Sequence, residues 1–256
     1  MWPLLKRRIV QADPMPMDEC EPLISVIIPA FDEADSLGKA IAAVQANDVT
    51  FEILVVDAGS SDDTVKISAV AGARVLESLR RQRAYQLNLG AQHARGGILL
   101  FLHADTLLPK HALQSIITAL GDGRAVGGAF ARRYASPSLL LRATCLLAHC
   151  RNRLIGWHLG DQAMFVRRAS FFQLGGFREV GQFEDLDFSR RLRTFGRTVT
   201  LRPCVTSSAR RFERSGPART TLRDFILTIR YVISGLPEPS PHAAPAYAHA
   251  KRIGNL

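Results

Sequence analysis

The sequence predicts an α/β domain with a mainly parallel central sheet flanked by helices. The main observation is that four apolar runs of strand length alternate with three helical segments between residues 23 and 102. Strands that succeed one another through helices lie parallel, joined by right-handed crossovers. The second observation is that 256 residues, 47% of them hydrophobic, suffice for a sizeable core. This composition excludes disordered, collagenous and coiled-coil proteins.

The regular elements fall in the first half of the chain. Residues 23–28 form an apolar run, broken only by Ser25, that is typical of a strand buried on both faces, and Pro29 ends it. We then expect alternating helices and strands, namely helix 35–46, strand 51–56, helix 63–71, strand 74–76, helix 82–94 and strand 98–102.

The alternation breaks down after residue 121, where an α+β pattern is expected. A Gly-rich stretch leads into the expected strand 129–134, and the later elements are helix 137–152, strand 163–167, helix 183–195 and two edge strands, 198–201 and 205–208. We expect a loosely ordered leader over residues 1–22, a single domain over 23–235 and a C-terminal tail over 236–256.

Charge is distributed unevenly along the chain. Residues 1–120 carry 11 basic and 14 acidic side chains, whereas residues 121–256 carry 22 basic and 9 acidic ones, and the net charge is +10. A cationic half suits a phosphate-bearing ligand, an anionic membrane surface or nucleic acid. Because no nucleic-acid-binding motif appears and aromatic residues make up only 7%, we expect no nucleic-acid partner.

The sequence also bears on location. No apolar run approaches the roughly 20 residues of a membrane span, and the first residues do not follow the pattern of a secretory signal. We therefore expect a cytoplasmic protein. Segment 137–153 carries Arg142, Arg151 and Arg153 beside apolar positions. This segment is either a core helix or a lid, or it is a peripheral contact with the inner face of an anionic membrane.

Acidic side chains follow three of the expected strands. Asp32 and Glu33 follow the first strand, Asp57 the second, and Asp105 the strand 98–102. In open α/β sheets, ligands bind at these carboxyl ends. Neither a GxGxxG turn, a Walker A loop nor the Gly-rich loop of a nucleotidyltransferase follows the first strand. A nucleotide would therefore be held by acids on its base and ribose and by a metal on its diphosphate.

Five motifs in order resemble glycosyltransferase family 2, of the GT-A fold. They are SVIIPAFDE (25–33), VVDAGSSDDT (55–64), LFLHAD (100–105), GGF (175–177) and ED (184–185). The resemblance spans about residues 24–211 and implies a nucleotide-diphospho-sugar transferase-like domain, with a nucleotide-binding half over 23–120 and an acceptor half over 121–235. More narrowly, segments 83–90, 102–106, 160–162 and 208–211 resemble the radical-SAM/selenodomain-associated transferases.

The resemblance implies inverting transfer from a nucleotide-diphosphate sugar, with a UDP-sugar expected first. The acceptor is an unidentified hydroxyl or carboxyl compound, with a lipid, a carotenoid acid and a small molecule all open. Asp185 is the implied general base, and the adjacent Glu184 gives a physical route to tuning its pKa. The residues implied to bind the nucleotide-sugar are Asp32, Glu33, Asp57, Arg83, Asn88, Ala104, Asp105, Asp161, Gln162, Arg210 and Arg211.

The metal site departs from the family pattern. Family members usually carry Asp-x-Asp, whereas this chain has His103-Ala104-Asp105. We expect a divalent cofactor, Mn²⁺ or Mg²⁺, with Asp105 as a ligand. His103 either coordinates it, which suits Mn²⁺ better, or packs at the strand end and leaves the ion to Asp105 and the diphosphate. Two alternatives stay open, a catalytically impaired nucleotide-sugar-binding or regulatory protein on this scaffold and a nucleotidyltransferase.

Overall fold

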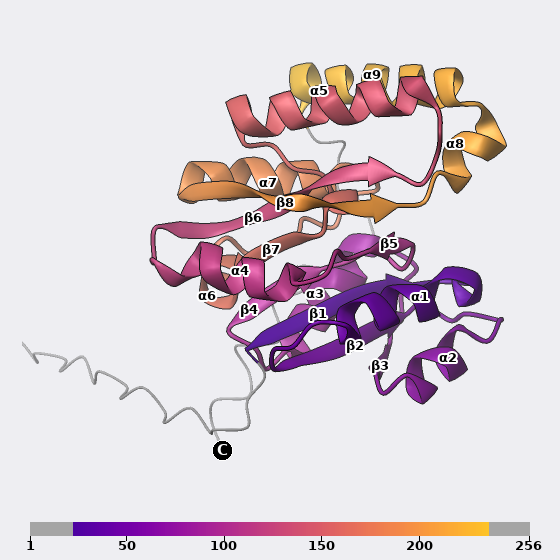
Figure 1. Cartoon of the computed structure of the whole chain (residues 1–256), viewed down its shortest axis with the longest axis vertical. Helices are drawn as coiled ribbons and strands as arrows, with labels where there is room; N and C mark the ends of the chain where they lie inside the picture. Colours follow the sequence, from indigo (N-terminus) through magenta and orange to yellow (C-terminus); the bar gives the residue numbers. More distant parts are fainter. Residues whose placement is uncertain (1–22, 236–256) are drawn as a thin grey trace, which may run out of the picture.

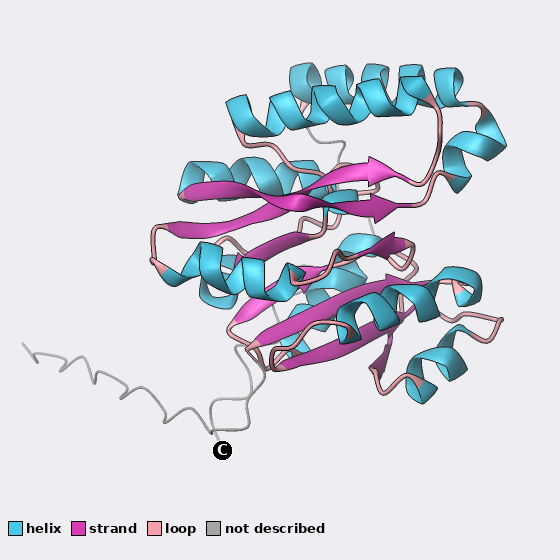
Figure 2. Cartoon of the chain, viewed as in Figure 1, coloured by secondary structure: helices cyan, strands magenta, loops and turns pink. Residues whose placement is uncertain are grey.

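The computed structural model describes residues 23–235, so the expectations for the leader 1–22 and the tail 236–256 lie outside the described residues. The strands are β1 (Ile24–Ala30), β2 (Phe51–Asp57), β3 (Arg74–Glu77), β4 (Ile98–Phe101), β5 (Thr106–Leu107), β6 (Ala125–Tyr134), β7 (Met164–Arg167) and β8 (Arg197–Ser207). They form one eight-stranded sheet in the order β3-β2-β1-β4-β7-β6-β8-β5 (Figures 1 and 2). The predicted α/β class and GT-A-like architecture are confirmed.

Helices cover both faces of this sheet. They are α1 (Ala34–Gln45), α2 (Thr64–Val70), α3 (Arg83–His93), α4 (Ala112–Gly121), α5 (Leu139–Ile155), the 3-10 turn η1 (Gly160–Gln162), α6 (Arg168–Gln173), α7 (Glu184–Phe195), α8 (Arg210–Ser215) and α9 (Pro217–Ser234). Apolar side chains of α1 and α4 pack in one core cluster, and those of α3, α6 and α7 pack in the other.

The first four strands align their carboxyl ends. β1 pairs in parallel with β2 and β4, and β2 pairs in parallel with β3. The register sets Ala30 opposite Asp57, the last residues of β1 and β2, and sets Phe101, the last residue of β4, opposite Ile27, three residues before the end of β1. Because these parallel strands end at the same edge of the sheet, the loops that follow them, which carry the acids named from the sequence, lie together there.

The second half differs from its prediction in two ways. Residues 198–207 belong to one strand, β8, which lies between β6 and β5, so the prediction of two separate edge strands is wrong. The Gly-rich stretch also enters the sheet, because β6 begins at Ala125. A Cβ at Gly127 would meet the carbonyl oxygen of Phe165 at 2.5 Å, and one at Gly128 would meet that of Val199 at 2.1 Å. These glycines thus permit close strands.

Helices α5 and α9 form an outer layer beyond β6 and β8 (Figure 1). The two helices contact each other, and α5 also contacts β6. Few of their side chains are buried: Leu141, Ala148 and Asn152 on α5, and Thr220 and Tyr231 on α9. Within residues 23–235, none of the helices combines the length and the apolar character that a membrane crossing requires.

Candidate active site

A cavity of about 300 Å³ opens at the carboxyl ends of β1 and β4. Its walls come from the loops after these strands and from the start of α3. The lining residues are Pro29, Ala30, Phe31, Glu33, Arg81, Arg83, Gln86, His103, Ala104 and Asp105. Five residues named from the sequence, Glu33, Arg83, His103, Ala104 and Asp105, therefore share one cavity, whose volume is at the lower end of the range for small-molecule sites.

Arg210 brings the second half of the chain to the acids of the first. It is the first residue of α8, and its Nη2 lies 2.6 Å from Glu33 Oε2 and 3.6 Å from Asp105 Oδ2. Burial, with the charge of Glu33, raises the pKa of Asp105, while Arg210 opposes this rise. Two carboxylates and one guanidinium thus meet at the cavity. The guanidinium of Arg210 can move from a carboxylate to an anionic ligand that enters the cavity.

Asp185 and His103 meet over the glycine that begins η1. The backbone N–H of Gly160 donates to Asp185 Oδ2 at 2.6 Å. A Cβ at Gly160 would lie 2.8 Å from His103 Nε2 and 3.1 Å from Asp185 Oδ2. The end of β4, the turn η1 and the start of α7 therefore touch here, and only a residue without a side chain leaves room for both groups.

Glu184 ties α7 to the cavity wall. Its carboxylate is buried and lies 3.2 Å from Nη1 of Arg83, which opens α3. Burial, followed by the charge of Asp185, raises the pKa of Glu184 to about 7, although Arg83 opposes the rise. Glu184 can thus gain or lose a proton near neutral pH, a property common among acid–base groups of active sites.

His103 is held in its neutral form. Burial and the positive charge of Arg83 lower its pKa to about 3. A neutral imidazole is the form that ligates a metal. Among residues 23–235 there is no group of three or more His, Cys, Asp or Glu side chains that could hold an ion. Asp105 and His103 therefore fit a divalent metal only if a bound diphosphate supplies further oxygen ligands.

Asp161 forms a partly buried polar cluster near His103. It makes an ion pair with Arg132, and the hydroxyl of Tyr134 donates to Oδ2 at 3.1 Å. Burial alone would raise the pKa of Asp161, but Arg132, His103 and Tyr134 together lower it. The second oxygen, Oδ1, is buried and has no hydrogen-bond donor within the described chain. This oxygen is therefore an unsatisfied hydrogen-bond acceptor near the cavity.

Asp32 and Asp57 serve the loops at the strand ends. Both oxygens of Asp57 are used, since Oδ2 accepts the backbone N–H groups of Gly59 and Ser60 at 2.9 Å and Oδ1 accepts the Ser60 hydroxyl. Asp32 Oδ1 accepts the backbone N–H of Ser61 at 2.8 Å. These acids therefore shape the rim of the site.

Three other residues named from the sequence have partners outside the cavity. Asn88 is buried and makes two hydrogen bonds with the backbone of Phe177, at 2.8 and 2.9 Å. Gln162 is buried, and its amide bonds to neighbouring backbone and to an arginine. Arg211 forms an ion pair with Asp224 of α9. Asn88 and Gln162 join elements around the site, and Arg211 joins α8 to α9.

The cavity also contains residues that the sequence did not single out. The guanidinium carbon of Arg81 lies 3.3 Å from the ring centroid of Phe31. Gln86 Nε2 donates to the carbonyl oxygens of Ala30 and Val56 at 3.0 and 2.8 Å, and so fixes the ends of β1 and β2. Phe31 lies within the first motif, so its place directly after the strand was the available signal.

Unusual backbone conformations border the site. Four non-glycine residues of the described chain have positive φ, and three of them, Asp32, Ala163 and Phe183, directly precede or follow site segments. Phe183, with φ of 67°, comes immediately before Glu184. Such conformations cost of order 1–3 kcal/mol each and concentrate at functional sites. At Phe183 the turn starts α7 with Glu184 directed at Arg83.

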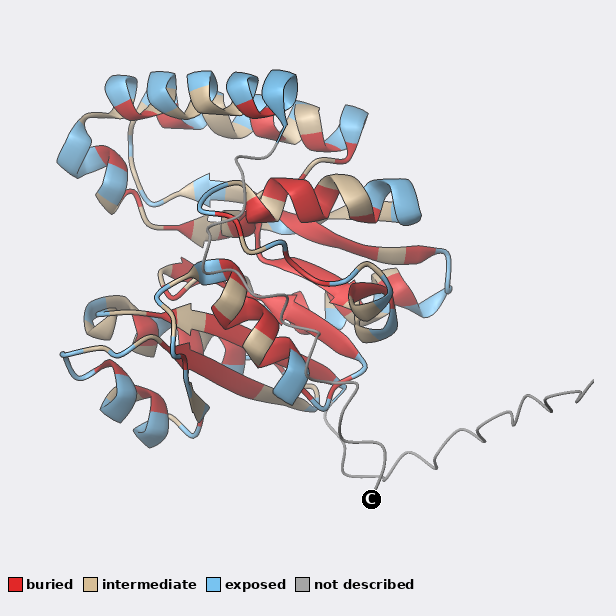
Figure 3. Cartoon of the chain, turned by 180° about the vertical axis from the view of Figure 1, so that it is seen from behind, coloured by how far each residue is buried: buried red, intermediate tan, exposed pale blue. Residues whose placement is uncertain are grey.

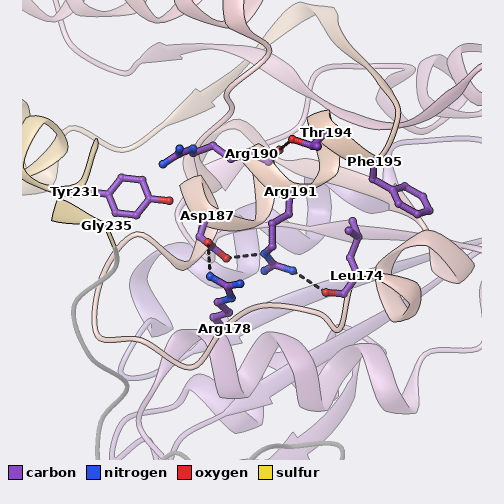
Figure 4. A pocket seen from close by; sticks show the side chains of 9 residues that line it. All are labelled: Leu174, Arg178, Asp187, Arg190, Arg191, Thr194, Phe195, Tyr231 and Gly235. Carbon is purple, nitrogen blue, oxygen red and sulfur yellow. Dashed lines mark hydrogen bonds and ion pairs between the residues drawn. The ribbon is translucent and has the colours of Figure 1, made fainter. Parts of the chain in front are cut away.

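A larger cavity, of about 600 Å³, lies between α7 and α9 (Figure 4). Its central acid, Asp187, already bonds Arg191 at 2.8 Å and Arg178 at 3.3 Å. Arg190 lies over the rings of Trp157 and Tyr231. Because none of the residues named from the sequence lines this cavity, the smaller one is the candidate active site.

The mixed sheet, with acids at its strand ends and a carboxylate pair opening a facing helix, fits the GT-A fold. Residues 25–174, more than half of the chain, match the domain called glycosyl transferase family 2. The protein belongs to this family.

Named relatives and solved structures agree with this membership. An uncharacterized protein of Mycobacterium tuberculosis is 31% identical over 208 residues, 69% of this chain and 63% of that protein. The undecaprenyl-phosphate 4-deoxy-4-formamido-L-arabinose transferase of Edwardsiella ictaluri is 28% identical over 56% of this chain and 48% of its own length. A mannosyltransferase structure from Pyrobaculum calidifontis, in complex with GDP-Man and Mn²⁺, superimposes with a TM-score of 0.61 at 22% identity, over 73% of this chain and 56% of that one.

Proposed function

We propose that this protein is a glycosyltransferase that moves a sugar, with inversion, from a nucleotide-diphosphate sugar to a hydroxyl or carboxyl acceptor, assisted by a divalent metal. The observation that carries the proposal is that three separate segments meet at one cavity. His103 and Asp105 line it, Asp185 lies beside His103 at Gly160, and Arg210 contacts Asp105. We assign donor binding to residues 23–120 and the acceptor side to residues 121–235.

The cavity offers a distinct partner for each part of the donor. Phe31, with Arg81 over its ring, supplies an apolar surface for the base, and Glu33 supplies acceptor atoms for its N–H groups or for ribose hydroxyls. Arg83 and Arg210 are cations within reach of a diphosphate. A UDP-sugar is the first choice of donor, and the Pyrobaculum mannosyltransferase, with GDP-Man bound, makes GDP-sugars the second.

We propose that Asp105 and His103 bind the metal. A bound Mn²⁺ or Mg²⁺ supplies positive charge that stabilises the leaving diphosphate. Asp105 would hold the ion, together with diphosphate oxygens, and neutral His103 would complete the set for Mn²⁺. The Mn²⁺ in the Pyrobaculum complex supports this proposal. Within the protein, Arg210 would leave Asp105 and hold the diphosphate, because an anion attracts it more than a half-shielded carboxylate does.

Asp185 is the proposed general base. The acceptor oxygen forms a bond to the anomeric carbon, its proton passes to the Asp185 carboxylate, and the bond to the diphosphate breaks with its electron pair on the leaving group. The N–H of Gly160 fixes Oδ2 of this carboxylate beside His103 and so directs it toward the metal side of the cavity. A base so placed typically contributes 10²–10⁴ in rate.

The acceptor is named here only by class. The Edwardsiella relative is called a transferase to undecaprenyl phosphate, which favours a lipid acceptor over a carotenoid acid or small molecule. We also place the chain in the radical-SAM/selenodomain-associated subgroup, supported by the four short segments that resemble it. The cysteines within the described residues, Cys145, Cys150 and Cys204, are free thiols, which suits action in the reducing cytoplasm.

A second candidate is a nucleotide-sugar-binding protein without turnover. It is favoured by one observation, the imidazole of His103 where relatives of this family usually offer a carboxylate. Calorimetry with UDP, with and without Mn²⁺, followed by turnover assays separates the two functions, since both predict binding and only one predicts reaction.

The direct test is turnover by the purified protein. We expect hydrolysis or transfer from at least one of a panel of UDP-, GDP- and dTDP-sugars in the presence of Mn²⁺ or Mg²⁺, and a large loss of rate with a chelator. Release of pyrophosphate from nucleoside triphosphates, without reaction of any sugar donor, would replace the proposal by nucleotidyl transfer. Metal-dependent UDP binding without any turnover would favour the binding protein.

A further inference from the structure

We propose that the outward face of α5 and α9 docks onto the surface of an anionic lipid bilayer. This surface lies outside the candidate active site, and the proposal does not depend on sugar transfer. It combines two features that are rare together on a solvent-exposed surface, a wide apolar stripe and a set of arginines without acidic partners.

The apolar stripe on α9 follows the helical repeat. Its members recur at spacings of three and four residues, so they share one face of the helix. They are Leu222, Phe225, Ile226, Ile229, Val232 and Ile233, each at least 41% exposed. The opposite face of α9 carries Tyr231 and Thr220, which are buried. Figure 3 shows this helix exposed on its outer side and buried on its inner side.

Helix α5 adds a second stripe beside the first. Leu139, Leu146, Leu147 and Leu154 are between 66% and 81% exposed. The two helices contact each other and run side by side in the same outer layer (Figure 1). We call these ten apolar residues of α5 and α9 the docking face. A set of this size on neighbouring helices marks an interaction surface.

Charge selects the occupant of the docking face. Exposed arginines flank it, and none of them forms an ion pair with a described residue. They are Arg142 and Arg153 on α5 and Arg219, Arg223 and Arg230 on α9. Helix α5 has no acidic residue, and the single acid of α9, Asp224, is paired with Arg211. An apolar stripe with basic flanks is the pattern of helices that lie in the plane of an anionic membrane surface.

The same charges disfavour protein occupants. A second copy of this face would set its own arginines against those of the first, with no acids to compensate. Residues 236–256 supply few acids to neutralise these arginines, because they contain one acid, Glu238, and two basic residues, Lys251 and Arg252. Anionic lipid headgroups, in contrast, neutralise the arginines while the acyl boundary takes the leucines and isoleucines.

The docking face is connected to the candidate site through the chain itself. Arg210, at the cavity, begins α8, and α9 follows directly after Gly216. On the other side, β6 carries Arg132 and Tyr134 of the polar cluster and leads into α5. Docking would therefore hold the cavity at a fixed distance from the bilayer, which suits an acceptor with an apolar part.

The test is sedimentation of the full-length protein with vesicles. We expect binding to phosphatidylcholine vesicles that contain 30% phosphatidylglycerol, weaker binding at high salt, and little binding to phosphatidylcholine alone. Ile226→Glu and Leu146→Glu should each lower binding at least tenfold. Arg223→Gln should lower it by about fivefold, the effect of one basic residue near an anionic surface.

Val70→Glu is the matched control, because Val70 is 83% exposed on α2, at the other end of the sheet. It should leave vesicle binding unchanged, and circular dichroism should show that all variants are folded. Equal binding to neutral and anionic vesicles, or no loss in Ile226→Glu, would overturn the proposal. So would a dimer in analytical ultracentrifugation that Leu146→Glu dissociates, since it would assign the face to a second copy.

Discussion

The two halves of the molecule contribute to the site in different ways. In residues 23–120, the acids at the strand ends are held mostly by their own loops, as Asp57 is by Gly59 and Ser60. In residues 121–235, the charged groups come from helix starts and reach across to the first half, as Glu184 does to Arg83 and Arg210 to Glu33. The first half is therefore a fixed platform, and the second half brings charged groups onto it.

The halves also differ in how they treat charge and apolar surface. The first half buries the strands β1, β2 and β4 between helices. The second half largely buries an ion pair, Arg132–Asp161, and leaves apolar residues of α5 and α9 exposed. We therefore expect substitutions of charged site residues to be costlier for folding in the second half than in the first.

The largest effect on stability is expected from Arg132→Met. Removing the guanidinium leaves Asp161 as a largely buried charge without its main partner, which costs about 3–5 kcal/mol of unfolding free energy. Urea denaturation measures the loss. Arg133→Met is the control, since the neighbouring Arg133 is exposed and should cost less than about 1 kcal/mol. Similar losses for the two variants would mean that the Arg132–Asp161 ion pair contributes no more to the unfolding free energy than an exposed arginine does.

Glu184 should make stability depend on pH. Its pKa is about 7 in the folded protein against 4.5 for an ordinary glutamate, so the folded state holds its proton more tightly. The contribution of Glu184 is therefore favourable below pH 4.5 and is lost as the pH rises through 7. The full change corresponds to about 3 kcal/mol. Unfolding free energies of the wild type and Glu184→Gln at pH 5 and pH 8 test this.

The wild type should lose more stability than Glu184→Gln between these two pH values. Other groups titrate in both proteins, so only the difference between them reports Glu184. Parallel pH profiles would show that Arg83 and Glu184 form an ordinary ion pair and that the carboxyl pair is not tuned.

Gly160→Ala should separate positioning from binding. The new Cβ would meet His103 Nε2 at 2.8 Å and Asp185 Oδ2 at 3.1 Å, so one of the two groups must move. A displacement of about 1 Å at a catalytic group costs roughly 100-fold in rate, and the affinity for UDP should change little. Gly97→Ala is the control, because its Cβ would meet nothing within 4 Å. A normal rate in Gly160→Ala would contradict the assignment of Asp185 as the general base.

The smallest effect is expected in the platform. Ser60→Ala removes the hydroxyl that donates to Asp57 and accepts the N–H of Asp32. Because Asp57 keeps two backbone donors, the loss of stability should be about 1 kcal/mol. Thermal unfolding measures it. A cost as large as that of Arg132→Met would contradict the contrast between the halves.

Much of the first half was predictable because its signals are local. Apolar runs of strand length and helical spacing place β1, β2, β4 and α3 within a few residues of their observed bounds. The same signals failed where tertiary packing decides. The sequence pattern around Gly127 and Gly128 predicts a loop, but both residues lie in β6. Glycine is required there because the backbones of β7 and β8 approach closely. Helices α4, α6, α8 and α9 were not predicted.

The candidate site was predictable only as a set of residue types at strand ends and in motifs. The sequence indicated Glu33, Asp105 and Asp185, but not that Arg210 would join the first two or that Gly160 would join Asp185 to His103. The sequence also did not indicate that the side-chain amides of Asn88 and Gln162 would form hydrogen bonds with backbone groups of adjacent segments. Such pairings depend on contacts between segments 25 to 177 residues apart.

The central claim is that acids from the two halves act in one cleft, and two variants measured together test it most directly. With a UDP-sugar that the enzyme turns over, Asp185→Asn should bind the donor as the wild type does and transfer 10²–10⁴ times more slowly. Asp105→Asn should lose the metal-dependent part of donor affinity. Asp35→Asn, an exposed acid of α1, should change neither. If both site variants lose affinity and rate to the same extent, or if Asp185→Asn keeps its rate, the account is wrong.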